Sequence, residues 1–125
     1  MISDDDLIAQ VRSYNPKTNA DLIRAAYAYG REMHEGQVRH SGEPYFSHPV
    51  EVAVILAGQQ LDDATIITAL LHDTIEDTRA SYVSVSENFG EEVAKLVDGV
   101  TKLTNLQLSS LETKQAENFR KLFMA

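Results

Sequence analysis

The residues best suited to chemistry lie in one short segment, A-L-L-H-D-T-I-E-D-T, which runs from Ala69 to Thr78. Its ionisable members are His72, Asp73, Glu76 and Asp77. Residues three or four positions apart share a face of a helix, so Asp73 continues the apolar face of Ile66 and Leu70. A carboxylate there is costly to bury unless a cation or hydrogen bonds compensate its charge. An unbroken helix through the segment would gather all four ionisable groups at its C-terminal end.

A second polar string, R-H-S-G-E-P-Y-F-S-H-P, runs from Arg39 to Pro49. Gly42 and Pro44 predict a loop, and His48 stands where this loop passes into a helix. A ring at such a junction can be held rigidly and still face a cleft. Two imidazoles and a carboxylate form a mixed ligand set suited to a divalent transition metal, with room left for water and substrate oxygens. The candidates for such a set are His48, His72 and Asp73.

Each of these residues, taken alone, also has an ordinary structural interpretation. A histidine such as His48 is more often a packing residue at a helix entry than a ligand. The pair His72 and Asp73 could be a satisfied polar pair in the core. The acidic pair that follows is typical of a solvated helix end, and the basic residues of the loop are typically solvated.

Helices must position these residues, because most of the chain has apolar residues at helical spacing and strand-like alternation is rare. Pro49 is predicted at a first helical position, and Asp62 or Asp63 as the cap of the next helix. The predicted helices cover residues 4–13, 19–35, 49–58, 62–75, 82–89, 91–102 and 110–124. In the second helix, the predicted apolar face consists of Leu22, Ala25, Ala26, Tyr29 and Met33. The predicted fold class is therefore all-α.

Length and composition are those of one globular domain, since 125 residues with 43% hydrophobic content can bury a core without disulfides. There are no cysteines, which excludes disulfides and thiolate zinc sites. No apolar run approaches the roughly 20 residues of a membrane span, and the acidic start lacks the basic region of a signal peptide. A cytoplasmic location is the default expectation.

The formal net charge of −8 argues against nucleic acid and anionic membranes as partners. It does not exclude a phosphorylated substrate, because a bound metal and a few local cations can reverse the field inside one cleft. Global charge therefore leaves the substrate class open.

Longer strings around these residues resemble a known family. The His72–Asp73 pair with an upstream histidine resembles the HD superfamily of metal-dependent phosphohydrolases. Three blocks resemble the hydrolase domain of the bifunctional (p)ppGpp synthetase/hydrolases, the RelA/SpoT-type alarmone enzymes. They are R-x-S-G-E-P-Y-x-x-H-P (39–49), L-L-H-D-T-x-E-D-T (70–78) and F-G-E-E-V-A-K-L-V-D-G-V-T-K-L (89–103). The blocks stand in the family's order over most of the chain from about residue 25 onward.

The resemblance implies an HD-domain helical bundle that hydrolyses the 3′-pyrophosphate of ppGpp or pppGpp, giving GDP or GTP and pyrophosphate, with manganese as cofactor. The positions that match its metal ligands are His48, His72 and Asp73. Its catalytic acidic pair matches Glu76 and Asp77. The segment that contacts the guanine nucleotide matches Arg39, His40 and Ser41, although the family often has lysine where this chain has His40.

The family's fourth metal ligand is an aspartate in a downstream helix, within a motif like L-A-D-R-L-H-N-M-R, which these 125 residues do not contain. The chain is therefore expected to be a single HD-type domain, residues 1–125, that is incomplete at its C-terminus. Metal binding by the chain as given is expected to be weak. An apolar face left without its covering helix would favour self-association.

Two other functions stay open: an HD phosphohydrolase for another nucleotide, against which the string R-x-S-G-E-P-Y speaks, and a non-catalytic module with the same fold. Three further residues have no assigned chemistry. His34 is expected to be structural or exposed, and Lys102 to be solvated. Gly99 costs about 1 kcal/mol relative to alanine in a helix, which favours a bend or close packing there.

Overall fold

The computed structural model describes residues 1–105, apart from the side chains of residues 76, 77 and 102–105. The predicted helix over residues 110–124 lies outside this range. Within it, the elements are α1 (Asp4–Tyr14), α2 (Ala20–Met33), α3 (Ser47–Gly58), α4 (Asp63–Leu71), α5 (Thr74–Asp77), α6 (Tyr82–Phe89) and α7 (Glu91–Asn105). The only β-type pairing among the described residues is an isolated bridge between Val38 and Pro44. The predicted all-α class is confirmed.

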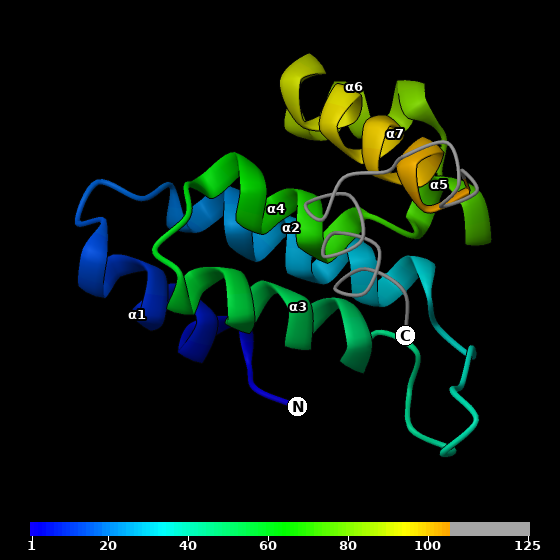
Figure 1. Ribbon diagram of the computed structural model, residues 1–125, viewed down its shortest axis with the longest axis horizontal. Coiled ribbons are helices and arrows are strands. Elements are labelled where there is room, and N and C mark those ends of the chain that lie inside the picture. Colours follow the sequence, from blue (N-terminus) through cyan, green and yellow to red (C-terminus); the bar gives the residue numbers. More distant parts are fainter. Residues whose placement is uncertain (106–125) are drawn as a thin grey trace, which may run out of the picture.

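Helix α4 is the centre of the fold. It packs against α2, α3 and α7, and Figure 1 shows α3 and the α6–α7 pair on opposite sides of it. All six residues from Ile66 to Leu71 are buried, as expected for a helix that is covered all round. No helix among the described residues is long and apolar enough to cross a membrane.

Local capping explains where several helices begin. Asn19 accepts a hydrogen bond from the Leu22 N–H at the start of α2, and Asp62 accepts from the Thr65 N–H at the start of α4. These bonds satisfy amide groups that have no partner inside the helix. Of the two predicted caps of α4, Asp62 is therefore the cap. Asp63 instead accepts from the Asn19 N–H at 2.8 Å and so ties α4 to the start of α2.

The predicted apolar face of α2 is right in part, because Ala26 is buried and Leu22 and Tyr29 pack against the core, whereas Ala25 is exposed. The buried residues of this helix are Ile23, Ala26, Tyr27 and Gly30. Gly30 has no side chain to signal burial, yet it lies against the Phe46 ring and the Leu70 carbonyl. Tyr27 can be buried because its hydroxyl donates to the Ile2 carbonyl at 2.7 Å. Gly30 thus lets α2 approach both the start of α3 and the end of α4.

We expect Gly30→Ala to destabilise the fold. A Cβ at this position would lie 2.5 Å from Phe46 Cε1 and 2.9 Å from the Leu70 carbonyl oxygen. The Phe46 ring cannot easily move away, because the Tyr27 ring packs edge-on against it, with ring centroids 5.1 Å apart. Overpacking of this kind costs about 1–3 kcal/mol, which outweighs the gain of about 1 kcal/mol in helix propensity. Unfolding in urea measures the free energy of unfolding of Gly30→Ala and of the parent protein.

Gly99→Ala is the matched control, because it makes the same change in α7. Among the described residues, a Cβ at Gly99 would meet nothing within 4 Å, so these residues do not pack closely there, and α7 continues through Gly99. We expect this variant to be more stable than the parent by up to about 1 kcal/mol. Equal unfolding free energies for the two alanine variants would contradict the packing argument.

Candidate metal centre

His48 is carried by the first turn of α3. The helix begins at Ser47, two residues earlier than the predicted start, and Pro49 is its third residue. A proline is tolerated there because the first-turn amides have no partner inside the helix. The His48 N–H donates to the Tyr45 carbonyl at 3.2 Å, and the side chain is buried. The buried His48 side chain thus stands where the loop passes into the helix.

His72 and Asp73 lie at a break between two helices, so the predicted continuation of one helix through this segment is wrong. Side chains donate hydrogen bonds to the carbonyls at the break. The ring of His72 donates from Nδ1 to the Ala69 carbonyl at 2.7 Å. Thr74 Oγ1 donates to the Leu71 carbonyl at 2.8 Å, and Thr101 Oγ1 donates to the His72 carbonyl at 3.3 Å. Such bonds compete with the helical ladder.

The break allows two adjacent side chains to face one point. In a continuous helix, neighbouring residues project about 100° apart, given 3.6 residues per turn. Here His72 Nε2 lies 3.2 Å from Asp73 Oδ2, and the His48 and His72 rings are 5.5 Å apart between centroids. One ligand atom from each of the three residues lies within 4.8 Å of the others. The structure thus brings His48, His72 and Asp73 together.

The hydrogen bond of His72 determines which ring nitrogen carries the proton. A carbonyl oxygen can only accept, so Nδ1 is the donor to Ala69. In the neutral ring, Nε2 then presents a lone pair toward the Asp73 carboxylate, and a proton or a cation must lie between the two. Metal-binding histidines commonly hold their other nitrogen against a backbone carbonyl in this way. The donor set and its tautomer fit a divalent cation.

The Asp73 carboxyl is held in its ionised form. Its side chain is 17% exposed, and this burial alone would raise its pKa. When a proton lies between His72 and Asp73, the hydrogen bond and charge of His72, the Tyr45 hydroxyl and the charge of His48 together outweigh burial, so the pKa of Asp73 lies below its ordinary value. An ionised carboxylate is the form that binds a metal.

The predicted catalytic acids, Glu76 and Asp77, belong to α5, but their side chains lie outside the described part of the structure. The helix that carries them is fixed at both ends. Thr74 is fully buried, and Thr78 Oγ1 donates back to its carbonyl at 2.6 Å. The roles of the two acids stay predictions.

The predicted nucleotide-binding residues are not part of this cluster. His40 and Ser41 are exposed on the turn that follows α2. Arg39 is half-buried, and its Nη1 lies 3.7 Å from Glu51 Oε2 on α3 and 3.9 Å from Glu43 Oε2. Arg39 therefore reaches the helix that carries His48, while its contact with a nucleotide stays a prediction.

The search for functional residues in the sequence missed two that touch the centre. Tyr45 donates its hydroxyl to Asp73 Oδ2 at 2.8 Å, and Thr101 donates to the His72 carbonyl. Both belong to strings that resemble the family, Tyr45 to S-G-E-P-Y and Thr101 to V-D-G-V-T-K-L. Their place in these strings was the feature of the sequence that could have pointed to them. His34, expected to be structural or exposed, is buried, and its ring packs beside Tyr45.

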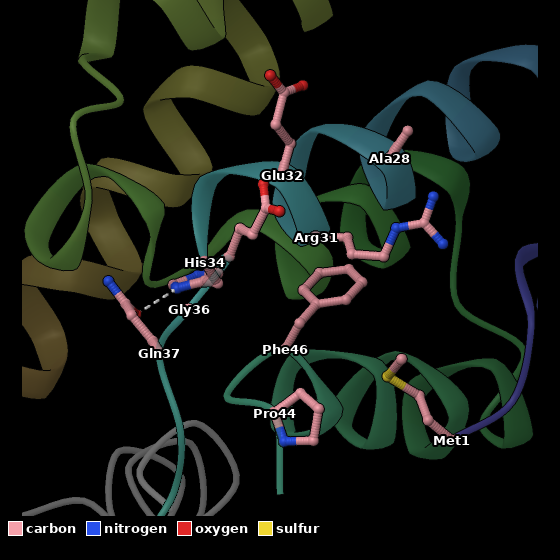
Figure 2. Close-up of a pocket in the computed structure, with 10 residues that line it drawn as sticks. Met1, Ala28, Arg31, Glu32, His34, Gly36, Gln37, Pro44 and Phe46 are labelled. Atoms are coloured by element: carbon pink, nitrogen blue, oxygen red, sulfur yellow. Dashed lines mark hydrogen bonds between the residues drawn. The ribbon is translucent and has the colours of Figure 1, made fainter.

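A hollow of about 540 Å³ lies away from this cluster, at the C-terminal end of α2. Figure 2 shows Arg31, Phe46 and Met1 around it, and its lining includes none of the predicted site residues. The chemistry of the centre therefore gives this hollow no role.

Comparison with known proteins agrees with the geometry. The HD domain family matches residues 26–125. The chain is 55% identical over 118 residues to a GTP pyrophosphokinase of Myxococcus xanthus, which covers 92% of this chain and 16% of that protein. It is 50% identical over 115 residues, with the same two coverages, to the bifunctional (p)ppGpp synthase/hydrolase SpoT of Escherichia coli K12.

The same segment is 50% identical to a protein of Escherichia coli O157:H7 named guanosine-3′,5′-bis(diphosphate) 3′-pyrophosphohydrolase, again over 16% of that protein. The chain thus spans about a sixth of the length of the curated relatives it matches. The resemblance inferred from the three strings is confirmed. With the HD domain family matched over residues 26–125 and a buried His–Asp centre to go with it, the chain belongs to the HD domain family.

Proposed function

We propose that this domain hydrolyses the 3′-pyrophosphate of ppGpp or pppGpp to GDP or GTP and pyrophosphate, with the assistance of a divalent metal, Mn²⁺ being the expected ion. The observation that carries the proposal is the convergence of His48, His72 and Asp73 within 4.8 Å. The string R-x-S-G-E-P-Y and the names of two relatives as (p)ppGpp hydrolases support this substrate.

The candidate residues would have three different roles in the reaction. His48, His72 and Asp73 would hold the metal, which supplies Lewis acidity toward a phosphoryl oxygen and lowers the pKa of bound water. Glu76, with Asp77, positions or deprotonates the attacking water. The nucleotide is contacted by Arg39, His40 and Ser41.

The bond changes are those of hydrolysis. The water oxygen bonds to the phosphorus next to the 3′ oxygen, the bond between that phosphorus and the 3′ oxygen breaks, and the 3′ oxygen gains a proton. Pyrophosphate leaves, and the nucleotide keeps its 5′ phosphates.

The fourth metal ligand that the family resemblance implies lies in a motif that these 125 residues do not contain. Loss of an outer partner of a metal site typically costs roughly 10–100-fold in affinity or activity, and loss of a direct carboxylate ligand should cost at least as much. We therefore expect the 125-residue chain to bind Mn²⁺ weakly and to turn over little ppGpp. An extended chain that carries the downstream aspartate helix should do both well.

The experiment compares these two chains. Each is incubated with ppGpp and MnCl₂, with and without EDTA, and GDP and pyrophosphate are separated by ion-exchange chromatography. Equal Mn²⁺ affinity and turnover in the two chains would contradict the fourth-ligand expectation. Hydrolysis of other nucleotides in place of ppGpp would favour another HD phosphohydrolase, and metal binding with no hydrolysis of any nucleotide would favour a non-catalytic module.

A further inference from the structure

Tyr45 lies between two of the three candidate ligands. Its backbone carbonyl accepts a hydrogen bond from the His48 N–H at 3.2 Å. Its phenol hydroxyl donates to Asp73 Oδ2 at 2.8 Å. These two bonds join the start of α3 to the break between α4 and α5, two segments that are far apart in the sequence. One residue therefore links the two parts of the chain that form the centre.

The hydroxyl restricts the Asp73 carboxylate. Two torsions place the oxygens of an aspartate: χ1 has three staggered wells and the terminal torsion is broad, so packing alone defines the position of these oxygens poorly. A hydrogen bond to an ionised carboxylate is about twice as strong as one between neutral groups. Here the bonded oxygen, Oδ2, is also the one that lies 3.2 Å from His72 Nε2. The Tyr45 hydroxyl thus acts on the carboxylate at the point where it meets the histidine.

Tyr45 is itself held by its surroundings. Its ring packs against the His34 imidazole, with centroids 4.9 Å apart and planes at 32°. His34 Nδ1 and Gln37 Oε1 are hydrogen-bonded at 2.9 Å, the dashed contact in Figure 2. The backbone carbonyl of Gln37 also accepts from the Tyr45 N–H at 2.9 Å. Because His34 is only 2% exposed, this support does not depend on a solvent-exposed side chain.

We propose that Tyr45 is a positioning residue for Asp73: its hydroxyl orients the carboxylate for a divalent cation, and the buried His34, hydrogen-bonded to the half-buried Gln37, holds the tyrosine in place. The consequence for metal binding rests on the proposed function, since it requires that Asp73 be a ligand. The effect of Tyr45 on the orientation of Asp73 in the metal-free chain does not depend on the proposed function.

The test variant is Tyr45→Phe, which removes the hydroxyl and keeps the ring that packs on His34. The matched control is Tyr27→Phe, which removes a hydroxyl that donates to the Ile2 carbonyl at 2.7 Å, away from the centre. In metal-free protein, three-bond NMR couplings report whether the Asp73 side chain holds one χ1 rotamer. We expect one rotamer in the parent and in Tyr27→Phe, and averaging among rotamers in Tyr45→Phe.

The second readout is Mn²⁺ affinity, measured by titrating MnCl₂ and counting free ion by electron paramagnetic resonance, which also detects weak binding. We expect Tyr45→Phe to weaken binding roughly 10–100-fold, and Tyr27→Phe to leave it near the parent value. A single Asp73 rotamer in Tyr45→Phe, or binding as tight as in the parent, would overturn the proposal. If even the extended chain with the downstream aspartate helix binds no Mn²⁺, the proposed function fails, while the Asp73 rotamer still decides the role of Tyr45.

Discussion

His72→Asn should abolish most Mn²⁺ binding and, with it, hydrolysis, while the domain stays folded. The asparagine amide nitrogen can occupy the place of Nδ1 and keep the 2.7 Å bond to the Ala69 carbonyl. It has no counterpart of Nε2, the atom that faces Asp73 at 3.2 Å. Removing a direct ligand should cost at least the roughly 10–100-fold that loss of an outer partner costs. Calorimetric titration with MnCl₂ and the unfolding midpoint of the metal-free variant measure the two effects.

Thr68→Val is the control for this variant. Thr68 is a buried polar residue of α4 whose hydroxyl donates to the Ala64 carbonyl at 2.7 Å. The change removes a buried hydrogen bond from the same helix and leaves the three candidate ligands untouched, so Mn²⁺ affinity should stay near the parent value. If His72→Asn binds Mn²⁺ as tightly as Thr68→Val, then His72 is not a ligand.

Glu76→Gln should bind ppGpp and turn it over slowly. The glutamine has nearly the same shape as the glutamate but cannot take a proton from water. Loss of general acid–base assistance typically costs ~10²–10⁴-fold in rate, whereas contacts that only hold the nucleotide are kept. A kinetic assay on the extended chain, together with equilibrium binding of ppGpp, separates turnover from affinity.

Glu87→Gln makes the same change at an exposed position of α6, outside the candidate centre, and should leave turnover unchanged. Turnover of Glu76→Gln equal to that of Glu87→Gln would remove Glu76 from the mechanism. A parallel loss of ppGpp affinity and turnover would instead assign Glu76 to substrate binding.

The helices were predictable where their ends are set by neighbouring residues. Helix α6 has the predicted bounds, Tyr82–Phe89, because Ser81 and Ser84 form reciprocal capping bonds at its start and Gly90 takes a φ of 94° at its end. These effects act over a few residues, so the local sequence contains them. The burial of Gly30 depends on its contacts with Phe46 and Leu70, which explains why helical periodicity did not place Gly30 on the buried face of α2.

The sequence by itself determined which atoms are available for chemistry. Imidazole nitrogens and carboxylate oxygens are properties of residue types, and the order of the three strings was enough to identify the family. The roles of the acidic pair on α5 stay predictions. The same holds for the loop residues Arg39, His40 and Ser41, because all of these roles depend on a bound nucleotide.

Only the tertiary structure decided how the donor atoms meet. At the break, the His72 carbonyl contacts a hydroxyl from Thr101, 29 residues away, and the Asp73 carboxylate accepts a hydrogen bond from Tyr45, 28 residues away. Helical periodicity describes neighbours within a turn or two, and it assumes that the backbone ladder is continuous. Where distant side chains bind to the ends of helices, the chain departs from that ladder, and adjacent residues such as His72 and Asp73 can then face the same point.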